Sequence, residues 1–296
     1  MILGIDIGGT TTKIGIVKND KIINKFIIDT HPKTIIDDII KKLKNKNIDI
    51  DDLHAIGAAM PGFIDHKKGI VTLSGNLGYK DYEFKKEFEI KINRPVYVVN
   101  DANAAALGEY WVGAGKDYNS TILYTLGTGV GGGVVLKNEL VFGSHGYAGE
   151  LGHGGFFQDK RKCNCGLDNC IEPMSSAVGI TKSLKEEFGD DRSLIDAEKD
   201  FIKKETRTIK AFTEALTPLA QHIAVMETAF NPEAIIIGGG PSNYGQSLAD
   251  FIQGLVSKYQ LNFITDSTPI VIATTKNDAG ILGAAYWALT NKAKEQ

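Results

Sequence analysis

The stretch DIGGTTTKIGIVKND (residues 6–20) is repeated later in the chain as TLGTGVGGGVVLKNE (residues 125–139). The two segments align without a gap at an offset of 119 residues. Each has the pattern of a strand, a turn of glycine and threonine, a second strand, and a polar turn of lysine, asparagine and an acid. An internal repeat of this kind indicates that one structural unit occurs twice in the fold.

Two further pairs of similar segments follow in a compatible order. They are PVYVVNDANAAALGEYW (95–111) with PIVIATTKNDAGILGAAYW (269–287), and, more loosely, AIGAAMPG (55–62) with AIIIGGGP (234–241). Strands that alternate with helical segments indicate α/β layers. We therefore expect two related α/β domains, at about 1–117 and 118–280. A C-terminal helix over about 280–296 is expected to pack back on the first domain.

Helical patterns fill the segments between the predicted strands. In TIIDDIIKKLKN (34–45), apolar residues recur at a spacing of three and four, which predicts an amphipathic helix. Residues 206–230 form a longer helical pattern that contains Pro218, and this proline predicts a kink or a break.

Composition excludes several classes of protein. The 296 residues carry a net charge of −3, so no basic field indicates a nucleic-acid partner. No apolar run reaches the ~20 residues that a membrane span needs. The start of the chain, MILGIDIGG, has the pattern of a core strand and not of a signal peptide. Its three cysteines form one short cluster, which argues against a disulfide framework, so a cytoplasmic protein is expected.

Both turns of glycine and threonine are candidates for binding phosphate. Glycine allows backbone N–H groups to approach an anion, and threonine hydroxyls add donors. A carboxylate at a strand end is a candidate for holding Mg²⁺ through water. Plain hairpin turns are the alternative, and no P-loop pattern is present. The candidate residues are Asp6, Gly8, Gly9, Thr10, Thr11 and Lys13 in the first turn, and Gly127, Thr128, Gly129 and Gly131 in the second.

The segment VVNDANAAALGE (98–109) delivers Asn100 and Asp101 to the end of a predicted strand. A carboxylate at this place can act as a general base toward a substrate hydroxyl that attacks phosphorus. Asn100 would then hydrogen-bond the same substrate. The alternative is that Asp101 only caps the following helix, because Asp and Asn are favoured at that position.

A cluster of potential metal ligands lies in GELGHGGFFQDKRKCNCGLDNCIE (149–172). Cys163, Cys165 and Cys170 form a C-x-C-x4-C pattern, and His153 precedes them by ten residues. Three thiolates and one imidazole suit a closed, tetrahedral and therefore structural zinc site. Buried free cysteines and an iron–sulfur cluster are the alternatives, although such a cluster normally takes four thiolates.

Two glutamates flank this cluster, Glu150 and Glu172. Each lies beside turn-forming residues and is a candidate for hydrogen-bonding sugar hydroxyls. Simple surface exposure is the alternative for both.

Taken together, these segments resemble the ROK family of sugar kinases and repressors, and the resemblance covers nearly the whole chain. It is greatest to the bacterial ROK glucokinases. The segments that carry it are GIDIGGTTTK, MPG, NDANAAALGE, LGTGVGGG, GELGH, CNCGLDNCIE and IIIGGG.

The resemblance implies a two-domain actin-like, ribonuclease-H-like ATPase fold with a cleft between the domains. It implies ATP as phosphoryl donor, Mg²⁺ as cofactor, structural Zn²⁺, and an aldohexose as acceptor, with glucose phosphorylation at the head of glycolysis as the expected reaction. Family members are commonly homodimers or homotetramers. By the family pattern Asp101 is the catalytic base, and Gly238, Gly239 and Gly240 lie near the adenosine. The sugar contacts implied are Gly62, Asn76, Asn100, Glu150, His153 and Glu172, with His153 serving zinc as well.

The sequence departs from the family pattern at two places, one in the zinc loop and one in the sugar loop. Asn169 stands where a glycine usually precedes the last cysteine, and asparagine tolerates the left-handed turn. Tyr79 stands where many glucokinases have tryptophan, which weakens the assignment of glucose. A kinase for N-acetylmannosamine, fructose or allose is therefore the main alternative.

Two alternatives outside the sugar kinases also arise. One is a sugar-binding repressor, but the first predicted strand begins at Ile2, and we expect no DNA-binding domain before it. The other is an ATPase of the same superfamily that activates a partner enzyme and carries an iron–sulfur cluster.

Overall fold

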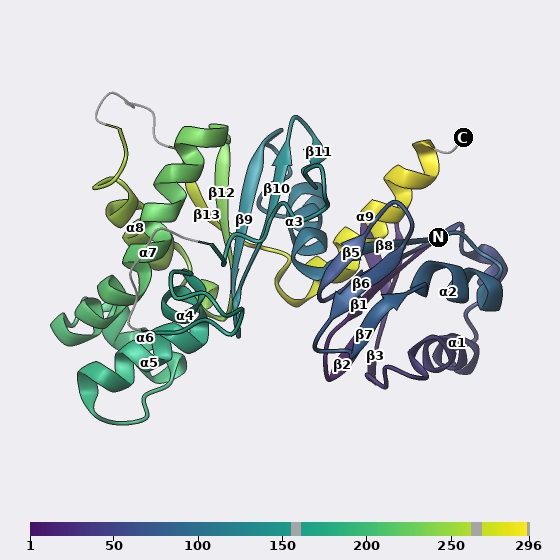
Figure 1. The fold of residues 1–296 in the computed structure, drawn as a ribbon, viewed down its shortest axis with the longest axis horizontal. Coiled ribbons are helices and arrows are strands. Elements are labelled where there is room, and N and C mark those ends of the chain that lie inside the picture. The colour runs from purple at the N-terminus through teal and green to yellow at the C-terminus, as the bar shows by residue number, and fades with distance from the viewer. Residues whose placement is uncertain (155–160, 262–267, 295–296) are drawn as a thin grey trace. The chain divides into compact units, whose positions relative to one another are not determined.

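The computed structural model describes residues 1–154, 161–261 and 268–294 (Figure 1). These residues form two compact units. The first unit contains Met1–Lys116, Leu140–Ala148 and the described residues from Asn277 onward. The second contains Asp117–Glu139 and, where described, Gly149–Lys276. No helix within the described ranges has both the length and the apolar character that crossing a membrane requires.

A five-stranded sheet forms the centre of the first unit, in the order β3-β2-β1-β4-β8. The three strands β1, β2 and β3 form an antiparallel meander, whereas β1, β4 and β8 run parallel. Because β4 is buried along its whole length, its sequence is continuously apolar, as in a strand covered on both faces. The bounds are β1 Ile2–Ile7, β2 Thr11–Lys18, β3 Lys21–Asp29, β4 Ala55–Met60 and β8 Val96–Asn100.

The helices of the first unit cover this sheet. In α1 the buried side chains are Ile35, Ile36, Ile39 and Leu43, as the apolar spacing predicts. A smaller sheet, β5-β6-β7, follows β4 in the chain. The bounds are α1 Ile35–Asn45, β5 Phe63–Asp65, β6 Ile70–Ser74, β7 Tyr79–Tyr82, α2 Phe84–Ile92, α3 Asp101–Val112 and α9 Ala279–Lys294. The last two residues of the predicted C-terminal helix lie outside the described residues.

The second unit repeats the sheet of the first, strand for strand. Its order is β11-β10-β9-β12-β13, with β9 and β10 antiparallel and β9, β12 and β13 parallel. The internal repeat explains this match, because β1 at 2–7 becomes β9 at 121–126 when 119 is added. The mixed α/β fold expected from the sequence is thereby confirmed. The bounds are β9 Thr121–Leu126, β10 Val130–Leu136, β11 Glu139–Leu140, β12 Ala234–Gly239 and β13 Ile270–Ile272.

Helices also accompany the second sheet. The longest, α7, runs through Pro218, so the alternative of a helix break at this proline is wrong. A short 3₁₀ turn, Gly240–Tyr244, follows β12 directly. The bounds are α4 Glu172–Ser175, α5 Ala177–Phe188, α6 Leu194–Ile202, α7 Thr206–Phe230 and α8 Gln246–Val256.

The segment Leu140–Ala148 belongs to the first unit, and its Phe142 ring contacts aromatic rings from two other segments of that unit. The Phe142 ring stacks on His66 with a centroid distance of 3.6 Å, and it lies 5.1 Å from the ring of Trp287 in α9. Packing of this kind joins three segments that are far apart in sequence.

Small residues allow α9 to lie directly against α3 and the sheet of the first unit, where α9 is drawn in yellow in Figure 1. A Cβ at Gly283 would lie 1.6 Å from the carbonyl oxygen of Ala104, and one at Gly57 would lie 1.8 Å from that of Ala284. Both contacts are with backbone, which cannot move aside as a flexible side chain can. The close approach therefore requires glycine at these positions.

We expect Gly283→Ala to lower the free energy of unfolding by about 1–3 kcal/mol, because the added methyl overpacks the contact between α3 and α9. Gly254→Ala in α8 is the matched control, since a Cβ there meets nothing within 4 Å. Alanine is the better helix former, so the control is expected to gain about 0.5–1 kcal/mol. Urea unfolding of both variants measures the difference, and equal midpoints would contradict the close-packing argument.

Candidate active site

The carboxyl ends of β1, β4 and β8 bring polar residues to one edge of the first sheet. These strands are parallel neighbours, with Asp6 paired to Ala59 and Met60 paired to Asn100. Asp6 and Asn100 are therefore separated by the single strand β4, and Gly62 follows the end of that strand. Ligands of open α/β sheets bind at such an edge.

Asn100 and Gly62 hold each other at this edge. The Asn100 side chain donates from Nδ2 to the carbonyl oxygen of Gly62 at 3.1 Å, and its Oδ1 accepts from the backbone of Ala102 and Asn103. Gly62 has a φ of +110°, and a Cβ there would lie 2.2 Å from the carbonyl oxygen of Leu73. Asn100 is thus the N-cap of α3, and Asp101 is the first residue of the helix. The Asp101 carboxylate also accepts from the Ala102 N–H, at 2.9 Å, so it shares the helix N-terminus with the Asn100 cap.

The first glycine and threonine turn joins β1 to β2 beside Asp6. The Gly8 N–H donates to the carbonyl oxygen of Thr11 at 3.0 Å, and the side chains of Thr10 and Thr11 are exposed. Lys13 Nζ lies 3.0 Å from Asp6 Oδ2, so these two candidate residues form an ion pair. Asn76 lies against the turn, because a Cβ at Gly9 would be 3.7 Å from its Cβ.

The Asp6 carboxylate also lies against the first turn of α9. A Cβ at Gly280 would be 2.6 Å from Asp6 Cγ. A carboxylate at a helix N-terminus is stabilised by the partial positive charge of that end. Glycine at this position leaves room for the carboxylate, which explains one of the small residues in the second pair of similar segments.

The equivalent turn of the second unit joins β9 to β10. The Gly127 N–H donates to the carbonyl oxygen of Gly129 at 2.9 Å, and the Thr128 side chain is exposed. Ala177, the first residue of α5, donates its N–H to the carbonyl oxygen of Gly127 at 3.0 Å. We call residues 127–130 the phosphate hairpin, after the expectation from the sequence that this turn binds phosphate. Backbone N–H groups at a turn suit anion binding.

The glycines at the end of β12 lie beside this hairpin. Gly239 pairs with Leu126 in the parallel ladder, and it has a φ of +90°. A Cβ on Gly239 would lie 2.1 Å from the carbonyl oxygen of Leu126. Gly238 and Gly240 flank it, and Gly131 lies in β10 opposite Thr125. All the candidate glycines of the second unit therefore lie on β10 and at the ends of β9 and β12.

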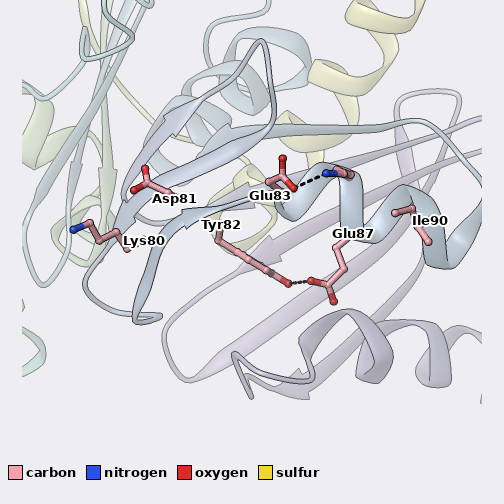
Figure 2. Close-up of a pocket in the computed structure, with 7 residues that line it drawn as sticks. Lys80, Asp81, Tyr82, Glu83, Glu87 and Ile90 are labelled. Atoms are coloured by element: carbon pink, nitrogen blue, oxygen red, sulfur yellow. Dashed lines mark hydrogen bonds and ion pairs between the residues drawn. The ribbon is translucent and has the colours of Figure 1, made fainter.

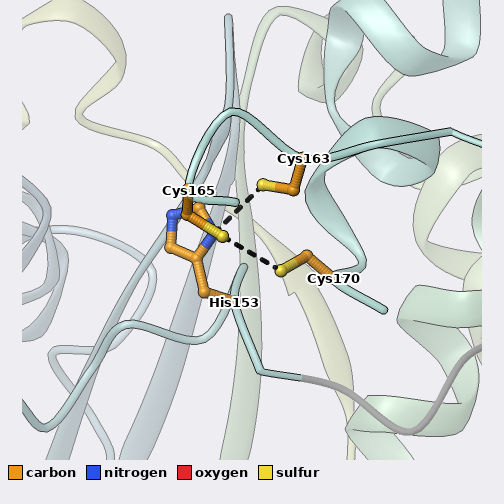
Figure 3. Close-up of side chains that lie close together, drawn as sticks. All are labelled: His153, Cys163, Cys165 and Cys170. Atoms are coloured by element: carbon orange, nitrogen blue, oxygen red, sulfur yellow. Dashed lines mark hydrogen bonds between the residues drawn. The ribbon is translucent and has the colours of Figure 1, made fainter. Parts of the chain in front are cut away.

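His153, Cys163, Cys165 and Cys170 come together, as Figure 3 shows. One ligand atom from each lies within 4.8 Å of the others. His153 Nδ1 is 3.5 Å from Cys163 Sγ, and the sulfurs of Cys165 and Cys170 are also 3.5 Å apart. All three thiols are free. The donor set of three sulfurs and one nitrogen fits a tetrahedral zinc ion, and no position is left open for substrate.

The surroundings of the cluster involve both flanking glutamates. The Glu172 carboxylate lies 3.5 Å from Cys163 Sγ through Oε1 and 3.9 Å from His153 Nε2 through Oε2. Desolvation raises the pKa of the Glu150 carboxyl; His153 opposes this rise and Glu172 adds to it. The two glutamates therefore lie in the electrostatic field of the same histidine.

Two connections of this region were not predicted. Glu172 Oε2 also accepts from the Val130 N–H of the phosphate hairpin, at 3.1 Å. Arg161 donates to the carbonyl oxygens of Pro173 and Gly179, to Ser183 and to Glu186. An arginine in the lysine-rich segment before the cysteines was the only sequence signal for the second connection.

A separate hollow lies at β7 and α2 in the first unit, with a volume of about 430 Å³ (Figure 2). The Tyr82 hydroxyl donates to Glu87 at 2.6 Å, and Lys86 pairs with Glu83 at 2.7 Å. Charges of both signs line it and are partly paired with one another. None of the predicted site residues belongs to it.

The duplicated α/β sheet, with polar residues at the strand ends of each copy, defines the actin-like class of two-domain ATPase folds. The ROK family model matches residues 2–291, and the chain belongs to the ROK family. The glucokinase of Halalkalibacterium halodurans is 34% identical, with 96% of this chain and 93% of that protein covered. The glucokinase of Thermotoga maritima is 33% identical, with 96% of each covered.

A solved structure agrees with these sequence relatives. The ROK family glucokinase of Streptomyces griseus, in complex with glucose and AMPPNP, matches with a TM-score of 0.83 at 28% identity. The match covers 98% of this chain and 99% of that one. The fold expected from the resemblance is therefore confirmed.

Proposed function

We propose that this protein is an ATP-dependent sugar kinase that transfers a phosphoryl group to the 6-hydroxyl of glucose. The observation that carries the proposal is the similarity to glucokinases of 33–34% identity over 96% of the chain. The placement of Asp101 beside the strand-end residues Asn100 and Gly62 supports it. The two compact units are proposed to be the two domains of the kinase.

Asp101 is the proposed general base, which takes the proton of the attacking hydroxyl. It lies in the first turn of α3, where its Oδ1 accepts from the Ala102 N–H at 2.9 Å and its carboxylate is held at the strand end. The sugar is held by hydrogen bonds, so that its hydroxyl is oriented toward phosphorus. The residues proposed to contact the sugar are Gly62, Asn76, Asn100, Glu150, His153 and Glu172.

The two hairpins are proposed to bind the phosphates of ATP. The exposed threonine hydroxyls are proposed to donate to the phosphate oxygens. The N–H groups of Gly8 and Gly127 close the two turns and fix their shape. Asp6 is proposed to hold Mg²⁺ through water, and a bound Mg²⁺ would neutralise charge on the phosphates. Lys13, paired with Asp6, adds positive charge at the same place. Gly238, Gly239 and Gly240 are proposed to lie near the adenosine.

His153, Cys163, Cys165 and Cys170 are proposed to bind a structural zinc ion, which would fix the positions of Glu150, His153 and Glu172. The protein is further proposed to be a cytoplasmic homodimer or homotetramer. Light scattering after gel filtration measures the assembly, and a monomer would contradict it.

The sugar specificity is tested by an assay of ADP release across a panel of hexoses and amino sugars. We expect the highest kcat/KM with glucose. A higher value with N-acetylmannosamine, fructose or allose would favour the main alternative. Tyr79 is the residue that motivates this alternative. Its hydroxyl donates a hydrogen bond to the carbonyl oxygen of Pro32 at 2.5 Å. Absence of ADP release with every sugar would contradict the kinase assignment.

A further inference from the structure

The Glu172 carboxylate lies between the phosphate hairpin and the metal cluster. On one side its Oε2 accepts from the Val130 N–H at 3.1 Å. On the other side its Oε1 lies 3.5 Å from Cys163 Sγ. One side chain thus contacts Val130, which lies 42 residues before it in the sequence, and Cys163, which lies 9 residues before it.

The hairpin is shaped around this carboxylate. A Cβ at Gly129 would lie 2.2 Å from Glu172 Oε2, so only glycine leaves the carboxylate in place. The segment before the cysteines also packs on the hairpin, because a Cβ at Gly152 would lie 2.2 Å from the Val130 carbonyl oxygen. The Glu172 N–H donates to the carbonyl oxygen of Gly152 at 3.2 Å, which ties Glu172 to that same segment.

His153 completes the connection on the metal side. Its Nδ1 faces Cys163 Sγ at 3.5 Å, while its Nε2 faces Glu172 Oε2 at 3.9 Å. A histidine that ligates a metal through Nδ1 carries its proton on Nε2. That N–H is oriented by an acceptor, and carboxylates commonly fill this role. The Glu172 carboxylate faces Nε2 at 3.9 Å, which is longer than a direct hydrogen bond, and its contact with His153 is therefore electrostatic.

We propose that Glu172 is a positioning residue that couples metal binding at His153 and the cysteines to phosphate binding at the hairpin. This inference rests on the proposed function, since it takes the hairpin to hold the phosphates of ATP. His153 and the three cysteines would hold the metal. With the His153 ring fixed in this way, the Glu172 carboxylate would stay against Val130, and the hairpin would keep the shape that binds phosphate. Thermodynamic linkage makes the effect reciprocal, so bound nucleotide strengthens metal binding.

The first test perturbs the carboxylate from the hairpin side. In Gly129→Ala the new methyl displaces Glu172 Oε2, which is the end of a flexible side chain, so the fold is expected to persist. We expect its zinc affinity to fall by about tenfold, as when a metal-bound histidine loses its carboxylate partner, and zinc to pass to a chelator faster than in the wild type. Gly127→Ala is the matched control in the same hairpin, because a Cβ there meets nothing within 4 Å.

The rate of zinc loss tests the link between the hairpin and the metal cluster without an assay of catalysis. Metal loss at the same rate in Gly129→Ala, Gly127→Ala and the wild type overturns it. If Gly129→Ala fails to fold, Glu172→Gln carries the same test, because it keeps the size of the side chain and loses the charge that faces His153. Faster metal loss from Glu172→Gln supports the link, and an unchanged rate overturns it.

The second test measures reciprocity in the absence of sugar. A non-hydrolysable ATP analogue with Mg²⁺ is expected to slow the loss of zinc from the wild type and to have a smaller effect in Gly129→Ala. An analogue that binds without changing zinc loss overturns the coupling alone. An analogue that does not bind the zinc-loaded wild type contradicts ATP as the donor, and the coupling fails with it.

Discussion

Replacing Asp101 with asparagine is expected to lower kcat by about 10²–10⁴-fold, the usual effect of removing a general base. This loss corresponds to about 3–5 kcal/mol in the activation free energy. The amide keeps the size of the carboxylate but cannot take the proton of the sugar hydroxyl. KM for glucose is expected to change far less, because Asn100 and Gly62, which hold each other at the strand end, are left intact. Steady-state kinetics with an ADP-release assay measures both parameters.

A matched control separates catalysis from helix stability. Asp101 is the first residue of α3, so its replacement also removes a charge that stabilises the helix by about 0.3–1 kcal/mol. Asp38→Asn makes the same chemical change in the first turn of α1, where the carboxylate also accepts from the Thr34 hydroxyl at 2.8 Å and lies 3.3 Å from His31 Nδ1. Both variants are expected to melt at slightly lower temperature, and only Asp101→Asn is expected to lose turnover. A kcat for Asp101→Asn close to the wild-type value would remove Asp101 from the role of base.

The duplicated sheet could be predicted because its signals are local. Each hairpin is formed by one continuous segment of the sequence. Adding 119 to the residue numbers of β1 and β2 aligns them with β9 and β10. The edge that holds Asp6 and Asn100 follows from the same reasoning, because parallel strands bring their carboxyl ends together. The metal cluster could be predicted for a related reason, since all four ligands come from one short segment.

The contacts between segments could not be predicted in this way. Glu172 and Val130 meet because α4 begins beside the start of β10, and no periodicity in the sequence records that meeting. Arg161 has the composition of a solvated basic segment, yet its guanidinium donates to two carbonyl oxygens in and near α5. At Pro218 the local signal was misleading, because proline usually ends a helix and α7 continues through it. Tertiary packing decided each of these cases.

Loss of one metal ligand is expected to have the second large effect. Cys170→Ser should reduce bound zinc from about one ion per chain to near zero, because a serine hydroxyl is a poor substitute for a thiolate. Cys170 is buried, and its sulfur accepts from the N–H of Gly154 at 3.4 Å. This sulfur therefore also contacts the backbone of the residue that follows His153. Elemental analysis of the purified protein measures the metal. Asn164→Ser, an exposed change between two of the cysteines, is the matched control and should keep its zinc.

The kinetic consequence of Cys170→Ser identifies what the metal site does. Metal-binding free energy in such sites is also folding free energy of the segment that carries the ligands. Without zinc, that segment no longer holds Glu150, His153 and Glu172, so KM for glucose is expected to rise and kcat to fall together. Asp101, the proposed base, lies in α3 and is not changed by this substitution. A variant that loses zinc but keeps wild-type KM and kcat would contradict the proposed role of the metal-binding residues in sugar binding. A wild-type protein that is purified free of metal and is fully active would contradict it equally.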